Sequence, residues 1–365
     1  MRPCSIQPSP PAAPAKKQIP ASNSPPGAVA IVRGDRLGDV ILSSMIPPYV
    51  RRFWPGVAVN FWVQPPWLPL FGEEAASGLV KALPTRPSGS GICPMTLAKM
   101  WQTEKIGTVV LLEPDATIEE AARMAGIAVR VGFSRNRRHH LTHALPYTKK
   151  KGLKHESDYA FDLLALIGLP RPATRLEPLI SPPSEASLSL QAFLRAQRLP
   201  PRLAVMHTGA HTGKPRIPAD YFIAVARALN EKKHPIALVG TEPDSELTRM
   251  LAELTPPIPV HDLGGKLSLD ELAYLLKEAS VFFSRDTGPA HLAAAMGCPT
   301  MVLFAQPSPG MDSRRWRPLG PRVTVMEKPL QPRLWENRFT LARRHFALIP
   351  PDEVAQTVAR AVGSP

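Results

Sequence analysis

Short apolar segments rich in strand-forming residues alternate with helical segments along most of the chain, and this alternation constrains the fold most strongly. Strands that alternate with helices form βαβ units, in which the strands lie parallel in one sheet. The sequence therefore predicts an α/β protein built on doubly wound parallel sheets. Strands are expected over residues 28–33, 57–63, 107–112, 127–133, 203–207, 235–239, 281–284, 300–304 and 323–326, and helices near 118–125, 157–167, 219–231, 244–254, 268–279, 288–296 and 352–362.

A proline-rich segment divides this pattern almost in half. Residues 169–187, LPRPATRLEPLISPPSEAS, hold five prolines and show no hydrophobic periodicity. A length of 365 residues is enough for two domains. We therefore expect a disordered, proline-rich tail over 1–26, an N-terminal domain over 27–175, a linker over 176–187, a C-terminal domain over 188–348, and a last helix within 349–365 that packs back on the N-terminal domain.

Composition narrows the class of protein. No apolar run approaches the ~20 residues that span a bilayer, and the first 26 residues are too rich in proline for a signal peptide. Cys4, Cys93 and Cys298 are far apart, without the spacing of a metal site or a disulfide framework, which suits the reducing cytoplasm. The net charge of +14 favours an anionic partner, which could be nucleic acid, a phospholipid surface or a phosphorylated substrate.

The loop after the first predicted strand carries two aspartates and two glycines in the sequence Gly-Asp-Arg-Leu-Gly-Asp, residues 34–39. It matches neither the dinucleotide-binding fingerprint nor the P-loop. A short helix should follow it and stop at Pro47-Pro48. Asp39 then has two interpretations: an N-cap that stabilises its helix by about 1 kcal/mol, or a carboxylate at the ligand-binding edge of the sheet that accepts a proton from a substrate hydroxyl.

A second loop, SRDTGPAHLAAAMG at 284–297, begins a helix with an acid, a hydroxyl, a glycine and a proline. The unpaired amides of Thr287 and Gly288 and the positive end of the helix form an anion site. His291 lies one turn into the helix, within reach of the same anion or of a sugar hydroxyl. The alternative is a well-made helix start, with Asp286 or Thr287 as its cap and His291 as a surface histidine.

Two further loops follow strands of the same predicted sheet. Residues 205–218 offer Lys214 and Arg216, and residues 238–246 offer Glu242. Because the carboxyl ends of parallel strands meet at one edge of a sheet, these side chains should share a cleft with the 284–297 loop. Cations suit a diphosphate, and a carboxylate suits a ribose or a base.

Together these motifs resemble glycosyltransferase family nine, the heptosyltransferases of lipopolysaccharide core assembly. The similarity extends over most of residues 28–326, and its specific part is the combination of Arg-Leu-Gly-Asp with Asp-Thr-Gly-Pro-x-His. The segments that carry the similarity are IVRGDRLGDVILSS, RVGFSRNRRHHLT, KHESDYAFDLLALIGLP, MHTGAHTGKPRIPADYF and DLGGKLSLDELAYLLKEASVFFSRDTGPAHLAAAMGCPTMVLF. The resemblance implies a GT-B fold of two facing Rossmann-like domains, of which the N-terminal one (27–175) binds the acceptor and the C-terminal one (188–348) binds the nucleotide sugar. It also implies an inverting, metal-independent transfer of heptose, or a related sugar, from ADP-heptose to an anionic lipopolysaccharide core acceptor.

The resemblance also assigns roles to residues. It implies that Asp39 is the general base, that Lys214 or Arg216 holds the diphosphate, that Glu242 contacts the nucleoside, that Asp286 contacts the sugar, that Thr287 and Gly288 bind the phosphates, and that His291 contacts the phosphate–sugar region. The chain departs from the family's Lys-x-Trp-Pro, since it has Lys-Pro-Arg-Ile-Pro, and Lys214 is one residue out of step with Pro218. It also has Phe304-Ala305-Gln306-Pro307-Ser308 where the family commonly has Phe-Gly-Pro/Ala-Thr.

Residues 132–156 form a basic loop in the acceptor half. It could be a solvated charged loop or a nucleic-acid contact, but no aromatic platform accompanies the charges. We predict that Arg135, Arg137 and Arg138, with Arg36, bind the anionic acceptor. The aromatic stretch 53–71 is either a buried strand with its connections or, at Trp67 and Phe71, a contact with the membrane surface.

The predicted protein is thus a cytoplasmic enzyme that touches the cytoplasmic face of the inner membrane transiently. Its partners are a nucleotide-sugar donor and the acceptor, with no nucleic acid, no cofactor and no metal. Two alternatives remain. A GT-B-type epimerase or hydrolase would turn over the nucleotide sugar alone. A non-catalytic basic module would bind nucleotides or nucleic acid, and its binding would survive Asp39→Asn.

Overall fold

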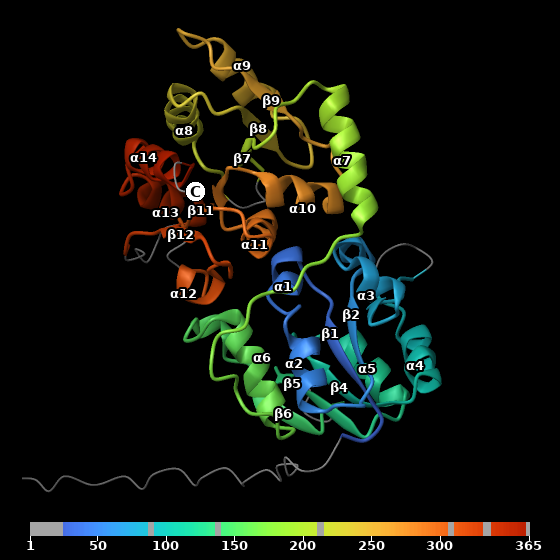
Figure 1. Cartoon of the computed structure of the whole chain (residues 1–365). Helices are drawn as coiled ribbons and strands as arrows, with labels where there is room; N and C mark the ends of the chain where they lie inside the picture. The colour runs from blue at the N-terminus through green and yellow to red at the C-terminus, as the bar shows by residue number, and fades with distance from the viewer. Residues whose placement is uncertain are drawn as a thin grey trace, which may run out of the picture.

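The computed structural model describes residues 25–86, 91–135, 140–209, 215–305, 310–330 and 337–362. These residues form two α/β domains, one above the other in Figure 1. Each domain contains a six-stranded sheet. The N-terminal sheet has the order β3-β2-β1-β4-β5-β6, and the C-terminal sheet has the order β12-β11-β10-β7-β8-β9.

All strand pairs of both sheets are parallel. The two orders are the same topology, with the first strand of each domain next to the fourth. Ligands of such sheets bind where the strand order reverses, outside the carboxyl ends of the central strands. That point lies between β1 and β4 in one domain and between β7 and β10 in the other. The strands are β1 (Ala28–Arg33), β2 (Val59–Val63), β3 (Val80–Ala82), β4 (Ile106–Leu111), β5 (Val129–Ser134), β6 (His143–Pro146), β7 (Ala204–His207), β8 (Ile236–Val239), β9 (Val260–Asp262), β10 (Val281–Arg285), β11 (Thr300–Leu303) and β12 (Val323–Met326).

Helices cover both faces of the N-terminal sheet. One core, in which Trp62 of β2 and Trp101 of α4 meet edge to face at 6.0 Å, lies under α4 and α5. The other face packs against α1, α2 and α6. The N-terminal helices are α1 (Leu37–Ile41), α2 (Ile46–Phe53), α3 (Gly72–Ala76), α4 (Pro94–Thr103), α5 (Ala116–Met124) and α6 (Glu156–Ala165), with 3-10 turns η1 (Pro65–Leu70) and η3 (Lys149–Lys151).

The C-terminal domain is built in the same way, and the last helix of the chain packs within this domain. Val354 and Val358 of α14 are buried in a core shared with α8, and Tyr221 of α8 donates to backbone carbonyls at Phe346 and Ile349. The expectation that residues 349–365 return to the N-terminal domain is therefore wrong for the described part of α14. The C-terminal helices are α7 (Ser184–Ala196), α8 (Ala219–Glu231), α9 (Ser245–Ala252), α10 (Leu269–Glu278), α11 (Gly288–Ala295), α12 (Ser313–Trp316), α13 (Arg338–Phe346) and α14 (Pro351–Val362).

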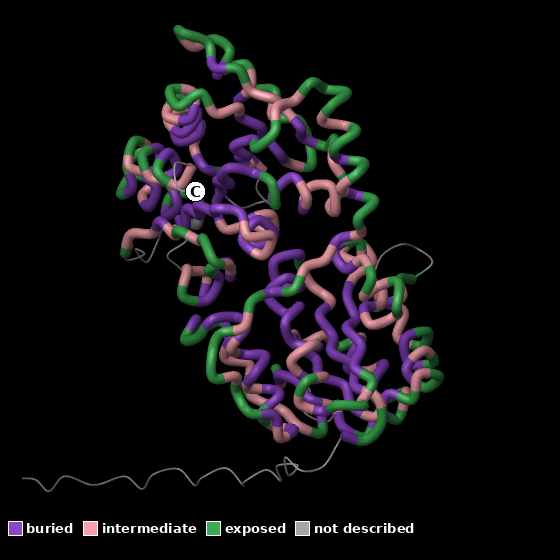
Figure 2. Tube along the Cα trace, in the orientation of Figure 1, coloured by how far each residue is buried: buried purple, intermediate pink, exposed green. Residues whose placement is uncertain are grey.

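The two domains meet through α1 and α11, which pack on each other. One hydrophobic core runs through this junction and holds buried residues of both domains (Figure 2). Glycines permit the close approach: a Cβ on Gly38 would lie 2.7 Å from the His291 ring, and one on Gly288 would lie 2.9 Å from the side chain of Leu37. The ligand-binding edges of the two sheets are thus brought face to face.

This architecture confirms the predicted two-domain α/β fold and all nine predicted strands. The edge strands β3, β6 and β9 were not predicted. Pro47 and Pro48 lie in the first turn of α2 instead of ending a helix, as proline at the start of a helix is tolerated. The predicted linker ends earlier than expected, because Ser184 begins α7. The proposed tail, up to residue 24, lies outside the described residues, and no described helix is long and apolar enough to cross a membrane.

Candidate functional site

Arg33 ends β1 at the point where the strand order of the N-terminal sheet reverses. Its side chain is 2% exposed. The guanidinium donates from Nε to Oδ1 of Asp35 at 2.7 Å and from Nη2 to Oδ1 of Asp39 at 2.5 Å. Burial opposes the charge of Arg33, but the neighbouring carboxylates outweigh burial and raise its pKa well above the ordinary value. A fixed cation therefore organises the loop that carries both aspartates.

Asp39 is the third residue of α1, and the N-cap of that helix is Arg36. The N-cap interpretation of Asp39 is therefore wrong. Its carboxylate is buried, bonded to Arg33, and its Oδ2 lies 3.5 Å from Nε of Arg36. Arg36 itself is 57% exposed, and its guanidinium lies 6.0 Å from the centre of the Trp316 ring. Asp39 is thus a held carboxylate at the domain junction, one residue from the glycine that contacts His291.

Asp35 shares the guanidinium of Arg33 but is half-buried. Burial raises the pKa of its carboxyl, Arg33 lowers it and Asp39 raises it, with a net result of about 6. Trp67 donates from its indole to the backbone carbonyl of Asp35 at 2.9 Å, which fixes the loop from the side of η1. Two carboxylates on one cation therefore differ in burial and in environment.

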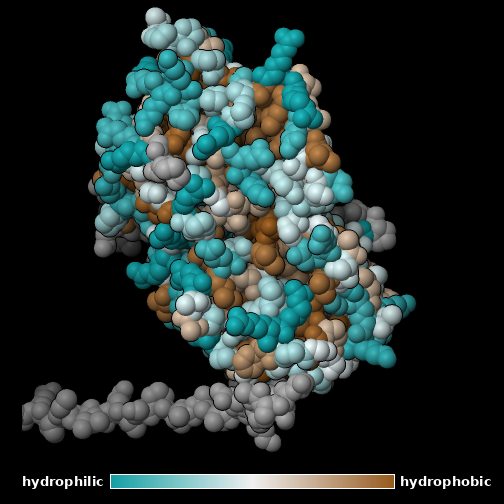
Figure 3. Space-filling model, viewed as in Figure 1, coloured by the Kyte–Doolittle hydropathy of each residue, from teal (hydrophilic) through white to brown (hydrophobic). Residues whose placement is uncertain are grey.

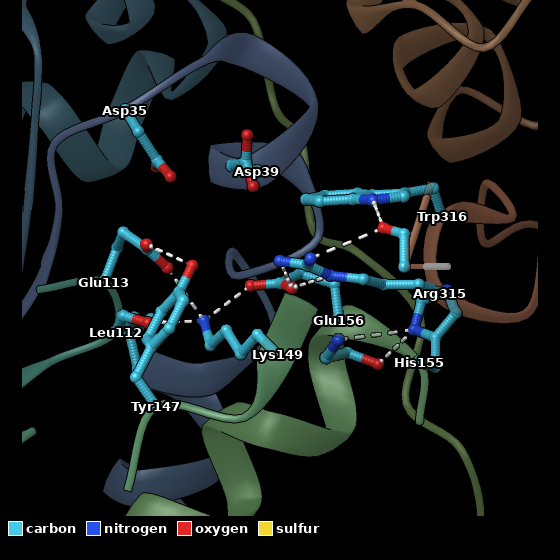
Figure 4. Close-up of polar contacts among 12 residues, drawn as sticks. Asp35, Asp39, Leu112, Glu113, Tyr147, Lys149, His155, Glu156, Arg315 and Trp316 are labelled. Atoms are coloured by element: carbon cyan, nitrogen blue, oxygen red, sulfur yellow. Dashed lines mark hydrogen bonds and ion pairs between the residues drawn. The ribbon is translucent and has the colours of Figure 1, made fainter. Parts of the chain in front are cut away.

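Glu156, the first residue of α6, joins three cations, of which Lys149 and Arg315 are labelled in Figure 4. Its Oε1 accepts from Arg33 at 3.1 Å and from Lys149 at 2.6 Å, and its Oε2 accepts from Nε of Arg315 at 2.9 Å. Burial would raise the pKa of this carboxyl, but Arg33, Lys149 and Arg315 overcome it and lower the pKa to about 2. Glu156 is therefore ionised throughout the physiological range.

Lys149 fills the space between Glu156 and the end of β4. Its ammonium, 1% exposed, donates to Glu156, to the carbonyl of Leu112 at 2.7 Å and to Glu113 Oε2 at 3.2 Å, which uses all three of its protons. The interpretation of residues 132–156 as a solvated loop is therefore wrong for Lys149. Glu113 comes two residues after the end of β4, so this ion-pair network spans the β1–β4 switch point.

The facing edge of the C-terminal domain carries the start of α11. Thr287 is the N-cap, and its hydroxyl contacts the carbonyl of Arg285 at 3.3 Å. Gly288 is the first helical residue, so its amide belongs to the positive end of the helix. His291 is 3% exposed, and its Nε2 lies 3.6 Å from Oδ1 of Asp286. The interpretation of His291 as a surface histidine is wrong, because its ring is packed against the Gly38 backbone.

A short segment of the C-terminal domain reaches the N-terminal network. We call residues 310–317 the docking segment. Arg315 binds Glu156, and the indole of Trp316 donates to the carbonyl of Gly310 at 2.9 Å (Figure 4). The ring of His155 donates from Nε2 to the carbonyl of Arg317 at 2.8 Å; burial lowers the pKa of His155 to about 4, so the neutral ring makes this bond.

Some of the remaining predicted residues lie at the surface, and others lie outside the described residues. Arg216 and Glu242 are exposed on loops after β7 and β8. Arg135 is 52% exposed, donates to Glu113 at 2.8 Å and stacks 4.2 Å from the Tyr147 ring. The structure therefore leaves Arg135 at the surface, close to the network. Lys214, Arg137, Arg138 and Gln306 lie outside the described residues.

The aromatic stretch does not form a membrane contact at Phe71. This ring is 3% exposed and packs edge to face on Phe61 at 5.8 Å, so the buried interpretation is confirmed for it. The face of the molecule in Figure 3 shows apolar residues scattered among hydrophilic ones. Within the described ranges, no group of three or more His, Cys, Asp and Glu side chains is arranged to hold a metal ion.

Sequence reasoning missed the residues that support Asp39. Arg33 was visible as a charged residue at the end of an apolar strand, and Glu156 as an acid at the start of a helix. Their pairing joins positions 123 residues apart, and nothing in the local pattern predicts it. Arg315 lies still further along the chain and belongs to the other domain.

Comparison with known proteins shows which family the chain resembles. A sequence model described as "Glycosyltransferase family 9 (heptosyltransferase)" matches residues 121–337. Lipopolysaccharide heptosyltransferase 3 of Escherichia coli is 33% identical over 102 residues, which are 27% of this chain and only 28% of that protein.

Two solved structures share the fold over almost their whole length. The family 9 glycosyl transferase of Veillonella parvula DSM 2008 superposes with a TM-score of 0.75 at 15% identity, over 95% of this chain and 99% of that one. The E. coli ADP-heptose lipopolysaccharide heptosyltransferase II superposes with a TM-score of 0.71 at 17% identity, over 92% and 98%. The architecture is thus the GT-B fold.

Proposed function

The chain belongs to glycosyltransferase family 9, and we propose that it transfers a heptose, or a closely related sugar, from ADP-heptose to an anionic lipopolysaccharide core acceptor with inversion at the anomeric carbon. The names of its relatives support the donor and acceptor classes. The net charge of +14 supports an anionic acceptor.

In this proposal Asp39 is the general base. Its carboxylate takes the proton of an acceptor hydroxyl, and the oxygen forms a bond to the anomeric carbon of the sugar. The bond between that carbon and the phosphate oxygen breaks on the opposite side, and its electron pair leaves with the nucleoside diphosphate. Asp39 ends the step protonated, and it returns the proton to solvent after product release.

The C-terminal domain holds the donor. The positive end of α11 at Thr287 and Gly288 receives the phosphates, and Asp286 and His291 contact the sugar and the phosphate next to it. Lys214 or Arg216 supplies a cation to the leaving diphosphate, and Glu242 contacts the nucleoside. No metal is required in this scheme, because a helix terminus and a side-chain cation together neutralise the leaving group.

The acceptor lies on the N-terminal side, near Arg36 and Arg135, with Arg137 and Arg138 on the same loop. One observation carries the proposal: the buried Asp39 directly follows Gly38, the glycine that packs on the His291 ring across the domain junction, so the base and the predicted donor site meet at one junction. We expect the enzyme to work in the cytoplasm and to meet its acceptor at the membrane surface.

A donor and acceptor screen tests this function. The purified protein is incubated with ADP-heptose and with other nucleotide sugars, with and without delipidated core oligosaccharide, and nucleotide release and glycan mass are followed. The proposal expects release of ADP that depends on the acceptor and a mass gain of one heptose. Turnover of donor alone would favour an epimerase or hydrolase. Binding to DNA that falls steeply with salt, without turnover, would favour a basic binding module.

A further inference from the structure

The docking segment approaches the N-terminal domain through its backbone as well as its side chains. Gly310 has φ 77°, and a Cβ at this position would lie 2.6 Å from the carbonyl oxygen of Lys150. Only glycine combines that backbone conformation with so close an approach. The docking segment is therefore seated on η3, the turn that carries Lys149.

The two oxygens of the Glu156 carboxylate bind cations from different domains. Its Oε1 receives Arg33 and Lys149 from the N-terminal domain, and its Oε2 receives Arg315 from the C-terminal domain, at 2.8 Å from Nη2 and 2.9 Å from Nε. All of these side chains are at most 8% exposed. The Coulomb attraction within ion pairs that are shielded from water in this way is stronger than in pairs at the surface, and removing one partner leaves a buried charge uncompensated.

The same guanidinium links Glu156 to Asp39. Arg33 Nη2 lies 2.5 Å from Asp39 Oδ1 and 3.1 Å from Glu156 Oε1, so one nitrogen donates to both carboxylates. A change in the charge around Glu156 therefore changes how much of the positive charge of Arg33 acts on Asp39.

We propose that Glu156 is a positioning residue for Asp39, acting through Arg33, and that Arg315 joins Glu156 only when the two domains come together, so that closure completes the environment of the base. This inference rests on the proposed function, in which Asp39 accepts the acceptor's proton. It adds a role for Glu156 and for the docking segment, neither of which touches donor or acceptor in the proposed scheme.

Several charged groups contact Asp39 or belong to the network and the helix start near it, and their effects on the Asp39 carboxylate have opposite signs. Cations favour the ionised carboxylate and move the acid limb of the pH–rate profile to lower pH, whereas anions move it to higher pH. The cations are Arg33 and Arg36 from the β1–α1 loop, Lys149 from η3 and Arg315 from α12; the anions are Asp35, Glu156, Glu113 after β4 and Asp286 before α11; and His291 of α11 contacts the neighbouring Gly38.

The signs give a test. Glu156→Gln removes an anion and leaves Arg33 free to act fully on Asp39, so the acid limb of kcat/KM should move to lower pH by about one unit. The base is then weaker and less well placed, and kcat should fall roughly 10- to 100-fold. The KM for the donor should hardly change, because the donor lies on the other domain.

Arg315→Met should move the same limb in the opposite direction, and by less, because Glu156 then neutralises Arg33 more completely. It should also lower kcat, since closure loses a contact. Arg314→Met is the matched control: it removes the same charge from the neighbouring, exposed position of α12 and should leave kcat and the pH profile unchanged. Circular dichroism confirms that each variant is folded, and Arg315→Met carries the test if Glu156→Gln does not fold.

The inference is overturned if Glu156→Gln loses activity with an unmoved acid limb, if Arg315→Met moves the limb to lower pH or not at all, or if Arg314→Met behaves like Arg315→Met. An inactive wild-type protein would refute the proposed function and this inference with it. An active wild-type protein with unmoved variants would refute the inference alone.

Discussion

Two buried arginines end two strands of this protein, and their surroundings differ. Arg33 at the end of β1 is bonded to three carboxylates. Arg285 at the end of β10 is 4% exposed, and its Nε and Nη1 have no hydrogen-bond partner among the described residues. Burial lowers the pKa of Arg285, and Asp286 opposes this only at a distance. An unpaired buried charge costs stability, whereas a paired one becomes costly when its partner is removed.

Substituting each arginine by methionine should therefore have opposite effects on stability. Arg285→Met is expected to raise the free energy of unfolding of the ligand-free protein by about 1–3 kcal/mol, because it removes an uncompensated charge at similar volume. Arg33→Met is expected to lower it by about 3–5 kcal/mol, because three carboxylates are left facing one another. Urea titrations of both variants measure the difference. Destabilisation by Arg285→Met would mean that its guanidinium is compensated.

Gly38 is a second position at which one atom decides the packing. Gly38→Ala would place a Cβ 2.7 Å from the His291 ring, across the domain junction. We expect a loss of about 1–3 kcal/mol in unfolding free energy, together with reduced activity, because overpacking forces the helices apart. The variant Gly38→Ala/His291→Ala removes the clash and serves as the control. If Gly38→Ala costs as much stability in the His291→Ala background as in the wild type, the ring is not its cause.

The candidate base and the α11 start were predictable from residue types, because both sit at the carboxyl ends of apolar strands. The partners of Asp39 were not. Arg33 and Glu156 pair over 123 residues of sequence, and the choice between an N-cap and a held carboxylate at Asp39 depended on which residue begins α1. Tertiary contacts made that choice.

At the scale of elements, the central strands were predictable because they are continuous apolar runs buried on both faces. The edge strands β3, β6 and β9 have three or four residues each and are only partly buried, so their pattern is weak. Pro47-Pro48 illustrates the same limit. A proline pair is compatible with the end of a helix and also with the first turn of the next one, so its presence alone does not decide between them.

The start of α6 should make stability depend on acid pH. The pKa of Glu156 lies at about 2 in the folded protein against an ordinary 4.5, so its stabilising contribution is fully present above pH 4.5 and is lost as the pH falls towards 2. The difference in unfolding free energy between wild type and Glu156→Gln should therefore shrink over that interval. Urea titrations of both proteins, from neutral pH down to a pH of about 2, measure this difference. A difference that stays constant with pH would contradict the cation-bound carboxylate.

At the scale of the whole molecule, two sheets of identical topology face each other, and the ion-pair network on one sheet is reached by a segment of the other domain. If a side-chain cation and the helix dipole neutralise the leaving diphosphate, sugar transfer should persist in EDTA. Initial rates with and without chelator check this expectation. A full loss that Mg²⁺ or Mn²⁺ restores would mean that the diphosphate is held by a metal ion and not by the α11 start.

The central claim is that Asp39 acts as the base in sugar transfer between the two domains. The measurement that tests it most directly compares wild type with Asp39→Asn in a single-turnover transfer assay, with ADP affinity measured in parallel by calorimetry. We predict a rate at least ~100-fold lower and an unchanged ADP affinity, as expected when a general base is lost and donor binding is retained. Near-normal transfer by Asp39→Asn would contradict the account.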